Sequence, residues 1–224
     1  MNQINFKIRL KLFGYYMIDF SFKVTYILLL TTGTITFIES IRTKIPMIRH
    51  IFNLETCVSI VAAYFYGQFL EKLKGPVNWK EIDQLRYLDW AITTPMMLIV
   101  LGAALSYNIQ RKVTLFQLSL LFFFNYVMLA LGYLGEEGIL DKKMAAFTSF
   151  LALFSMFGLI YHFYIEPKYN RFNVMLYGLY LLTWSLYGVV YFLENKQLWL
   201  NVLDVFSKCL IGIGLWIYYT RIVV

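Results

Sequence analysis

Seven apolar segments, each close to the length of a membrane-spanning helix, constrain this chain more than any other feature. A transmembrane helix needs about 20 predominantly apolar residues to cross the hydrocarbon core of a bilayer. Charged residues make up only 15% of the chain, against roughly 25% in a soluble domain. The sequence therefore predicts an all-α, multi-pass integral membrane protein that folds as a seven-transmembrane-helix bundle. The predicted spans are residues 20–41, 46–70, 84–106, 113–134, 143–165, 172–193 and 198–220.

The connections between these spans are short, so residues 20–224 are expected to form one domain. Seven spans place the two ends of the chain on opposite sides of the membrane. With a cytoplasmic C-terminus, eight basic and two acidic residues lie on the cytoplasmic side, and ten basic and eight acidic residues lie outside. The positive-inside rule favours this orientation. The net charge of +7 then indicates loops that face anionic lipid rather than a nucleic-acid partner.

Residues 1–19 precede the first span and have a pattern of their own. In the stretch INFKIRLKL, apolar residues alternate with polar and basic ones, a period of two that is typical of a β-strand. A lone strand needs a partner, which the second connection or a neighbouring subunit would supply. The alternative is a segment that lies along the membrane surface, and the sequence leaves both open.

Ionisable residues inside the apolar spans are the strongest functional signal, because a charge within a membrane is costly. Asp204 and Lys208 are four residues apart and therefore share one helix face. Arg86, Asp89 and Thr93 share one face of the third span in the same way. The two acids and two bases sum to zero charge, so we expect a neutral buried cluster between the third and seventh spans.

Lys208 has two interpretations. It ties helices together as a purely structural ion pair, or it forms a Schiff base with an aldehyde, a common role of desolvated lysines. Trp184, Tyr187 and Tyr191 form one aromatic face of the sixth span, and Trp90 adds an indole in the third. Aromatic stripes are usually plain core, but two aromatic walls beside a lysine suit a long, conjugated apolar ligand.

Three motifs together resemble those of the microbial (type-1) rhodopsins: RYLDW-x2-TTP in the third span, WSxYxxxY in the sixth and LDVxxK in the seventh. The stretches TTGTITFIES and RTKIPMIRH are similar to virus-encoded members of that family. The resemblance implies a seven-helix photoreceptor, not an enzyme, with all-trans retinal bound as a Schiff base to Lys208. Residues 20–224 would then be the retinal-binding domain.

The resemblance also implies roles for the other residues of these motifs. Asp89 resembles the primary counterion and proton acceptor, and Asp204 the second counterion. Arg86 resembles the gate toward the extracellular side, and Thr93 the hydroxyl group that hydrogen-bonds the acceptor. In the fifth span, only Phe147 is an aromatic match for the pocket. The residues that resemble retinal contacts are Trp90, Thr94, Met128, Gly132, Trp184, Tyr187 and Tyr191.

Two departures from the family's pattern bear on function. In outward proton pumps of the family, a carboxylate usually follows the acceptor by eleven residues and returns a proton from the cytoplasmic side, but here Val100 holds that position. Gly188 stands where many members have proline. Return of the proton is therefore expected to be slow unless another group replaces the missing carboxylate.

Glu55 is the candidate replacement. It lies nine residues after Pro46, about 13 Å along a helix, which places it inside the second span on the cytoplasmic half. A buried, unpaired glutamic acid would hold a proton at neutral pH and could donate it. The alternative is that Glu55 reaches the surface or pairs with Arg49 or His50. Channel members of the family also use a glutamate in the second span, so Glu55 alone does not separate pump from channel.

The sequence thus favours light-driven outward proton transport, in which Arg86 and extracellular acids such as Glu194 pass the proton outward. A light-gated cation channel is the first alternative, supported by Asn201 in the seventh span, and a light sensor without transport is the second. A chloride pump is disfavoured, because Asp89 would repel an anion. The expected partners are the lipid bilayer, protons or small cations, and further copies of the chain in a homo-oligomer. No metal site is expected.

Overall fold

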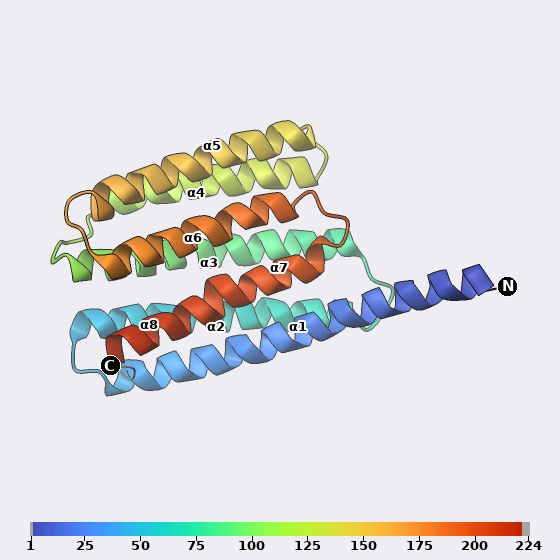
Figure 1. Ribbon diagram of the computed structural model, residues 1–224, viewed down its shortest axis with the longest axis horizontal. Coiled ribbons are helices and arrows are strands. Elements are labelled where there is room, and N and C mark those ends of the chain that lie inside the picture. Colours follow the sequence, from blue (N-terminus) through green and yellow to red (C-terminus); the bar gives the residue numbers. More distant parts are fainter. Residues whose placement is uncertain (1, 221–224) are drawn as a thin grey trace.

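The computed structural model describes residues 2–220, with side chains from residue 14 onward. The seven predicted spans are all helical and form a seven-helix bundle (Figure 1). The fifth and seventh spans each contain a π-helical segment, labelled η. The elements are α1 (Asn2–Arg42), α2 (Pro46–Lys72), α3 (Trp79–Asn108), α4 (Leu115–Glu136), α5 (Lys142–Ile160), η1 (Tyr161–Ile165), α6 (Arg171–Val190), α7 (Lys196–Asp204), η2 (Val205–Leu210) and α8 (Ile211–Thr220).

Six of the seven spans are long and apolar enough to cross a membrane by length and composition, when α5 is counted with η1 and α7 with η2 and α8. The remaining span is α2. Its buried side chains include Glu55, Thr56 and Ser59, which lower its apolar character. These polar groups face the interior of the bundle rather than lipid. The chain is an integral, multi-pass membrane protein, as predicted.

Polar residues at the ends of the apolar segments start the helices. Asn78 caps α3 by accepting a hydrogen bond from the backbone N–H of Lys80, at 3.2 Å. Thr114 and Gln117 form a reciprocal capping box at the start of α4, and Asp141 accepts from two backbone N–H groups of α5. These caps satisfy backbone donors that have no partner within the helix, so short connections suffice.

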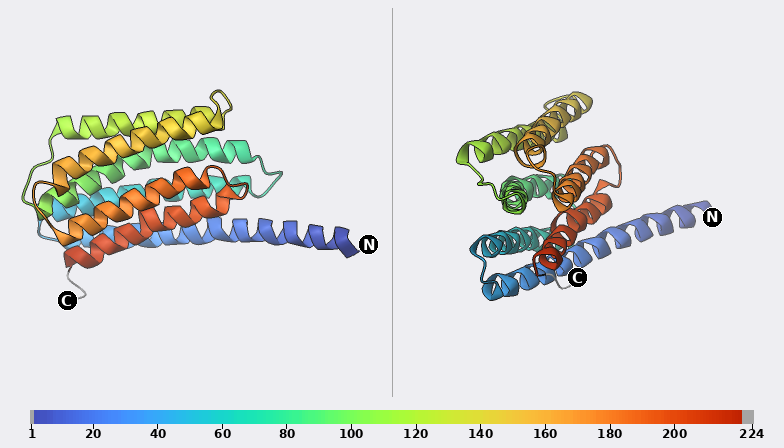
Figure 2. Two further views of the ribbon diagram at one scale, coloured as in Figure 1. Left: turned by 45° about the horizontal axis from the view of Figure 1, so that its top comes forward. Right: turned by 60° about the vertical axis from the view of Figure 1, so that its left-hand side comes forward.

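Helix α1 extends far beyond the first predicted span. It runs without a break from Asn2 to Arg42, and its N-terminal part projects past the end of the bundle (Figures 1 and 2). The strand predicted from the alternating pattern of residues 4–12 is therefore wrong. A lone strand leaves its backbone groups without hydrogen-bond partners, whereas a helix pairs them within the segment. The alternative, a segment on the membrane surface, stays a prediction.

The first and last spans are neighbours in the bundle. α1 packs along α2 and also contacts α7, η2 and α8, which closes the bundle. α3 contacts α2, α4 and α6, and it lies near the middle of the molecule (Figure 2). α6 contacts both α3 and α7. As a result, α3, α6 and the seventh span surround one interior space.

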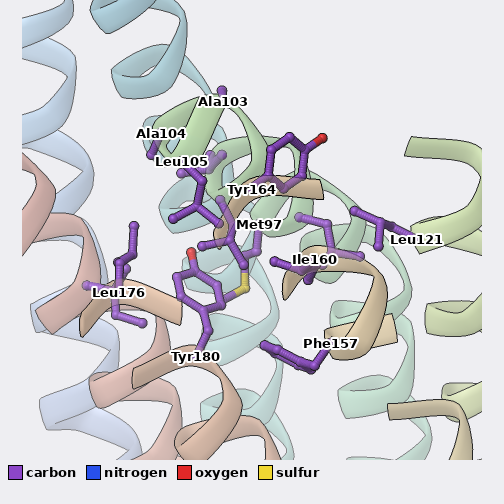
Figure 3. Close-up of a cluster of buried hydrophobic side chains, with 14 of the residues drawn as sticks. Met97, Ala103, Ala104, Leu105, Leu121, Phe157, Ile160, Tyr164, Leu176 and Tyr180 are labelled. Atoms are coloured by element: carbon purple, nitrogen blue, oxygen red, sulfur yellow. The ribbon is translucent and has the colours of Figure 1, made fainter. Parts of the chain in front are cut away.

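One half of the bundle interior is a dense apolar core. Figure 3 shows its side chains, among them Met97 from α3, Phe157 from α5 and Tyr180 from α6. Val100 is fully buried in this cluster. A charged carboxylate without a partner would cost several kcal/mol in such a place. The position eleven residues after Asp89 is therefore apolar, and its valine has no group that can hold a proton.

Candidate functional site

Lys208 lies in η2, the π-helical segment that interrupts the seventh span. Such segments occur frequently at functional sites. The Lys208 side chain is 2% exposed, and its Nζ lies 2.6 Å from Asp89 Oδ2 and 3.6 Å from Asp204 Oδ1. Both carboxylates are fully buried. One ammonium group thus lies between two carboxylates, one from α3 and one from its own span.

Arg86 supplies the second positive charge of the cluster. Its Nη1 lies 3.1 Å from Asp204 Oδ2, and its side chain is buried. The rings of Phe22, Tyr66 and Phe69 lie 5.0 to 5.7 Å from its guanidinium carbon, and aromatic faces attract a cation. The structure therefore brings together the four charges that the sequence placed in one neutral cluster.

The two carboxylates are held differently. Asp204 accepts hydrogen bonds from the hydroxyl groups of Tyr66, at 2.7 Å, and Tyr187, at 2.6 Å, besides its ion pair with the guanidinium group. Asp89 accepts from Lys208, and its Oδ1 is buried without a partner in the described part of the chain. Hydrogen bonds to a carboxylate favour its charged form. Asp204 is therefore held in its charged form by more donors than Asp89.

Thr93 does not donate to the Asp89 carboxylate, contrary to the expectation from the family. Its hydroxyl group donates to the backbone carbonyl of Asp89, at 2.8 Å. Thr94 donates in the same way to the carbonyl of Trp90, at 2.6 Å, and accepts from Asn125 Nδ2, at 2.9 Å. A hydroxyl group inside a helix commonly bonds to the carbonyl four residues earlier. The Thr94 side chain therefore links α3 to α4, whereas the Thr93 side chain forms a hydrogen bond only within α3.

A cavity of about 1000 Å³, including the part open to solvent, is lined by Lys208 and by residues of α3, α4, α5 and α6. The rings of Trp90 and Tyr187 meet edge to face in its wall, with centres 5.4 Å apart. A largely apolar cavity with a few polar groups is typical of a small-molecule site. The sequence-predicted ligand contacts that line it are Trp90, Thr94, Met128, Gly132, Trp184, Tyr187 and Tyr191.

The predicted pocket residue Phe147 is wrong. Its side chain is 60% exposed, whereas Phe150, one helical turn later, lines the cavity. The ring of Phe150 lies against Gly188, where an added Cβ would be 2.4 Å from the ring's Cζ. An added Cβ at Gly132 would likewise lie 2.9 Å from the hydroxyl oxygen of Tyr87. Both glycines therefore leave room that neighbouring aromatic side chains use.

A family model described as bacteriorhodopsin-like protein matches residues 16–222, which is nearly the whole chain. The chain belongs to the bacteriorhodopsin-like family. The resemblance of its motifs to those of microbial rhodopsins is thereby confirmed. This family consists of light-driven transporters and light sensors that use retinal as their chromophore.

Solved rhodopsin structures agree with this assignment. The chain is similar to the crystal structure of the viral rhodopsin OLPVRII, with a TM-score of 0.88 and 44% identity, over 92% of this chain and 99% of that chain. This similarity confirms the virus-encoded branch that the sequence suggested. A proton-pumping rhodopsin of the marine alga Acetabularia acetabulum shares the fold, with a TM-score of 0.75 and 17% identity, over 92% of this chain and 96% of that chain.

A curated relative is less similar in sequence than the viral rhodopsin. The chain is 28% identical over 175 residues to a green-light absorbing proteorhodopsin of Gamma-proteobacterium EBAC31A08. The match covers 68% of this chain and 65% of the length of that proteorhodopsin.

Glu55 lies inside this rhodopsin bundle. Its side chain is buried and has no hydrogen bond or ion pair with any residue of the described chain. Arg49 instead donates to a backbone carbonyl, at 2.9 Å, and His50 is exposed, so a surface position or a pair with either residue is wrong. An added Cβ at Gly212 would lie 3.1 Å from Glu55 Oε2. Glu55 therefore lies against the seventh span, one helical turn beyond Lys208.

A polar network that the sequence did not reveal leads from Arg86 toward the opposite end of the rhodopsin bundle. Arg86 Nη2 donates to Gln197 Oε1, at 3.0 Å, and Gln197 Nε2 donates to Asp83 Oδ1, at 2.6 Å. Lys196 Nζ lies 2.8 Å from Asp83 Oδ2 and also pairs with Glu136. The network joins α3, α4 and α7, which no local pattern in the sequence brings together.

Glu194, expected on the outward proton path, and Asn201, which supported the channel alternative, have different surroundings. Glu194 is exposed, and no hydrogen bond joins it to the residues that the structure describes. Asn201 is buried: its Oδ1 accepts from Tyr66, at 3.0 Å, and from Arg86, at 2.8 Å, and its Nδ2 donates to Ser21, at 2.8 Å. Asn201 thus joins four helices, whereas Glu194 is a solvated surface acid.

Proposed function

We propose that this chain is a retinal-binding photoreceptor that moves protons outward, away from its C-terminal side, in light. The observation that carries the proposal is the buried Lys208 Nζ, 2.6 Å from Asp89 Oδ2, at an aromatic-walled cavity. All-trans retinal, bound through Lys208, would supply light absorption and a change of shape. The remaining steps belong to residues of the chain.

The residues around Lys208 fit such a chromophore. Trp90 and Trp184 supply flat apolar walls, and Gly132, against which the Tyr87 side chain lies, also lines the cavity. The unpartnered Asp89 Oδ1 offers a free acceptor beside the lysine nitrogen. A positive charge on that nitrogen is balanced by the two carboxylates that flank it, so the site accepts a cationic chromophore without further change.

Asp89 is the proposed proton acceptor. In light, the N–H bond at Lys208 Nζ breaks and an O–H bond forms on Asp89, over a contact of 2.6 Å. Asp204 keeps its negative charge meanwhile, because two tyrosine hydroxyl groups and the guanidinium group of Arg86 donate to it. The negative charge of Asp204 stabilises the neighbouring cations while Asp89 holds the proton.

The order of polar residues along the seventh span supports outward transport. Gln197, Asp204 and Lys208 follow one another along it, and Glu55 meets it one turn later, at Gly212. Along the seventh span, Asp204 and Gln197 therefore lie on one side of Lys208, toward the start of the span, and Glu55 lies on the other side, toward its end. With a cytoplasmic C-terminus, Glu55 is on the cytoplasmic side and the acceptor faces outward. That orientation and a homo-oligomeric assembly stay predictions.

Glu55 is the proposed proton donor that restores the proton on Lys208. The core around Val100 is apolar, so the return path runs between α2 and the seventh span instead. Two further polar atoms of this half of the bundle, Ser59 Oγ and Tyr180 Oη, are buried without a partner among the described residues. Such atoms are suitable partners for water, which could link Glu55 to Lys208.

A light-gated cation channel remains the second candidate function, because one observation favours it. Asn201 joins Ser21 of α1, Tyr66 of α2 and Arg86 of α3 in a buried row of polar groups. Such a row between helices could carry water and a small cation when the helices separate. Photocurrent measured against membrane voltage in an expressing cell distinguishes the two functions. A pump current keeps its sign at all voltages, whereas a channel current reverses.

A further inference from the structure

We propose that Tyr180 is a positioning residue for proton return. Its hydroxyl group, together with Ser59 Oγ, orients the water through which Glu55 gives its proton to Lys208, and it stabilises the carboxylate that Glu55 then becomes. This inference rests on the proposed role of Glu55 as proton donor and deepens it. Tyr180 lies in α6 and Ser59 in α2, and both side chains are fully buried.

The hydroxyl group of Tyr180 lies in apolar surroundings. Its ring belongs to the apolar core that contains Met97 and Phe157, and its hydroxyl end points away from Phe157 (Figure 3). The Oη atom is buried without a hydrogen-bond partner in the described part of the chain. A buried hydroxyl group without a partner destabilises a fold, and phenylalanine would fill the same space without that cost. The hydroxyl group therefore calls for a partner that the described protein atoms do not supply.

A second hydroxyl group of this kind lies beside Glu55. Ser59 follows Glu55 by four residues in α2, so the two side chains share one face of the helix. Ser59 Oγ is buried without a partner among the described residues, and Glu55 has no hydrogen bond or ion pair with them. Ordered water commonly satisfies buried polar groups that the protein leaves unpaired.

Tyr180 reaches the surroundings of Glu55 from the other side of the bundle. The Glu55 carboxyl group acts electrostatically on the Tyr180 hydroxyl group, although no direct hydrogen bond joins them. Polar groups separated by more than a hydrogen-bond length are often bridged by water. Cys209, the residue after Lys208, interacts electrostatically with Glu55 as well. Tyr180, Glu55 and the segment that carries Lys208 therefore meet in one part of the interior.

The order of side chains along α6 places Tyr180 on the return side of the cavity. Tyr187 Oη donates to Asp204 Oδ1, at 2.6 Å, and Trp184, about one turn earlier in the chain, lines the cavity. Tyr180 precedes Trp184 by another turn, and the centres of their rings are 6.1 Å apart. Tyr180 thus lies beyond the cavity wall on the side away from Asp204, which is the side of Glu55.

The proposed step is a balanced proton transfer. The O–H bond of the Glu55 carboxyl group breaks and an N–H bond forms at the Lys208 nitrogen, with water passing the proton between them. Tyr180 keeps its own proton. Its hydroxyl group donates, through the water, to the carboxylate left on Glu55, and hydrogen bonds favour the charged form of a carboxylate. Tyr180 therefore makes proton loss from Glu55 easier and fixes the direction of the water.

Tyr180→Phe removes one oxygen atom and keeps the ring. Its matched control is Tyr164→Phe, because Tyr164 belongs to the same apolar core but donates its hydroxyl group to Gln117 Oε1, at 3.2 Å. Each variant is loaded with retinal, and flash photolysis records the return of the proton to Lys208. We expect return to slow by about tenfold in Tyr180→Phe, the effect of one lost hydrogen bond, and to slow similarly in Ser59→Ala. Tyr164→Phe should keep the wild-type timing, and wild-type timing in Tyr180→Phe overturns the proposal.

A double variant separates positioning of Glu55 from a general effect on the bundle. Tyr180→Phe added to Glu55→Gln should slow proton return no further than Glu55→Gln alone, because Tyr180 acts only through the Glu55 carboxyl group. Substitutions that act independently would instead multiply their effects on the rate. A further tenfold slowing in the double variant contradicts the assignment.

Infrared spectra recorded in the dark test the assignment without any transport. The wild-type spectrum minus that of Glu55→Gln isolates the carbonyl band of protonated Glu55. This band should move to higher frequency in Tyr180→Phe, because a carbonyl group that accepts fewer hydrogen bonds vibrates faster, and it should not move in Tyr164→Phe. An unchanged frequency in Tyr180→Phe, or a wild type without the band, overturns the proposal.

Failure of the donor role is distinguishable from failure of this inference. If Glu55→Gln recovers at the wild-type rate, Glu55 is not the donor, and the dark carbonyl band still decides whether Tyr180 positions its carboxyl group. A visible absorption band in each variant shows that the variant has folded. If Tyr180→Phe lacks that band, Ser59→Ala decides the proposal by the same two measurements.

Discussion

Replacement of Glu55 by glutamine tests how the protein regains the proton on Lys208. Glutamine has nearly the same shape as glutamic acid but cannot donate a proton as an acid. Glu55 has no hydrogen bond or ion pair with the described residues, so the substitution breaks no contact. The variant should therefore fold and bind retinal like the wild type, and any change in kinetics reports the lost acid.

The size of the effect follows from the setting of Glu55. The interior of this half of the bundle is otherwise apolar around Val100, and Glu55 is its only buried carboxyl group in the described chain. A positioned general acid contributes about 100- to 10,000-fold in rate. We expect recovery of the protonated Lys208 nitrogen to slow by about 100-fold. The proton then comes from water, so recovery should slow further by about tenfold per pH unit as pH rises.

Flash photolysis measures this recovery, and azide added to the medium should restore part of the rate by acting as a mobile acid. Glu39→Gln is the control, because Glu39 pairs with Arg42 at the end of α1, far from Lys208. Wild-type recovery in Glu55→Gln would refute the donor role. If recovery is unchanged while voltage clamp shows an altered reversal potential or current, Glu55 lines a channel instead. If neither changes, the proton returns directly from water.

Three further substitutions and one control test the site. Lys208→Ala should give a colourless protein after retinal is added, and a normal visible band in that variant would end the whole interpretation. Asp89→Asn removes the negative charge 2.6 Å from Lys208 Nζ, so its absorption should shift to the red and transport should stop; an unchanged spectrum with unchanged transport contradicts the acceptor role. Gly188→Ala places a Cβ 2.4 Å from the ring of Phe150, so thermal unfolding should show a loss of about 1–3 kcal/mol. Gly214→Ala meets no atom within 4 Å and should gain up to about 1 kcal/mol from helix propensity; the same sign in both variants contradicts the overpacking argument.

The fold was predictable because a bilayer requires each span to be a continuous apolar segment of nearly fixed length, which can be recognised along the sequence. Segment length and apolar composition suffice to define spans when no backbone group can remain unpaired in lipid. The predicted ends differ from the observed ends by a few residues in most spans, for example 46–70 against Pro46–Lys72. The strand prediction for the alternating N-terminal stretch was wrong because a two-residue period indicates a strand only where a partner strand exists. Here helix α1 continues through this stretch.

The charged centre was predictable in part from helical spacing. Residues three or four positions apart must share a face, so Arg86 and Asp89 were expected on one face of the third span, and Asp204 and Lys208 on one face of the seventh. The ion pairs Lys208–Asp89 and Arg86–Asp204 join these two faces across the bundle. The balance of two acids and two bases then predicted that the third and seventh spans lie side by side. Phe147 was misassigned because spacing does not define the rotation of a helix about its axis, and Phe150 lies one turn away on the face that meets the cavity.

Only the tertiary structure decided which polar residues work together across helices. Asp83, Glu136 and Lys196 come from three helices and are separated by dozens of positions, so no period in the sequence relates them. The burial and isolation of Glu55 likewise depend on how α2 packs against the seventh span. The local sequence determines the length of each helix, the helix face on which a residue lies and the charges on that face, because these depend on neighbours along the chain. Partner choice depends on the packing of whole helices, because a side chain's neighbours across the bundle exist only after the bundle has formed.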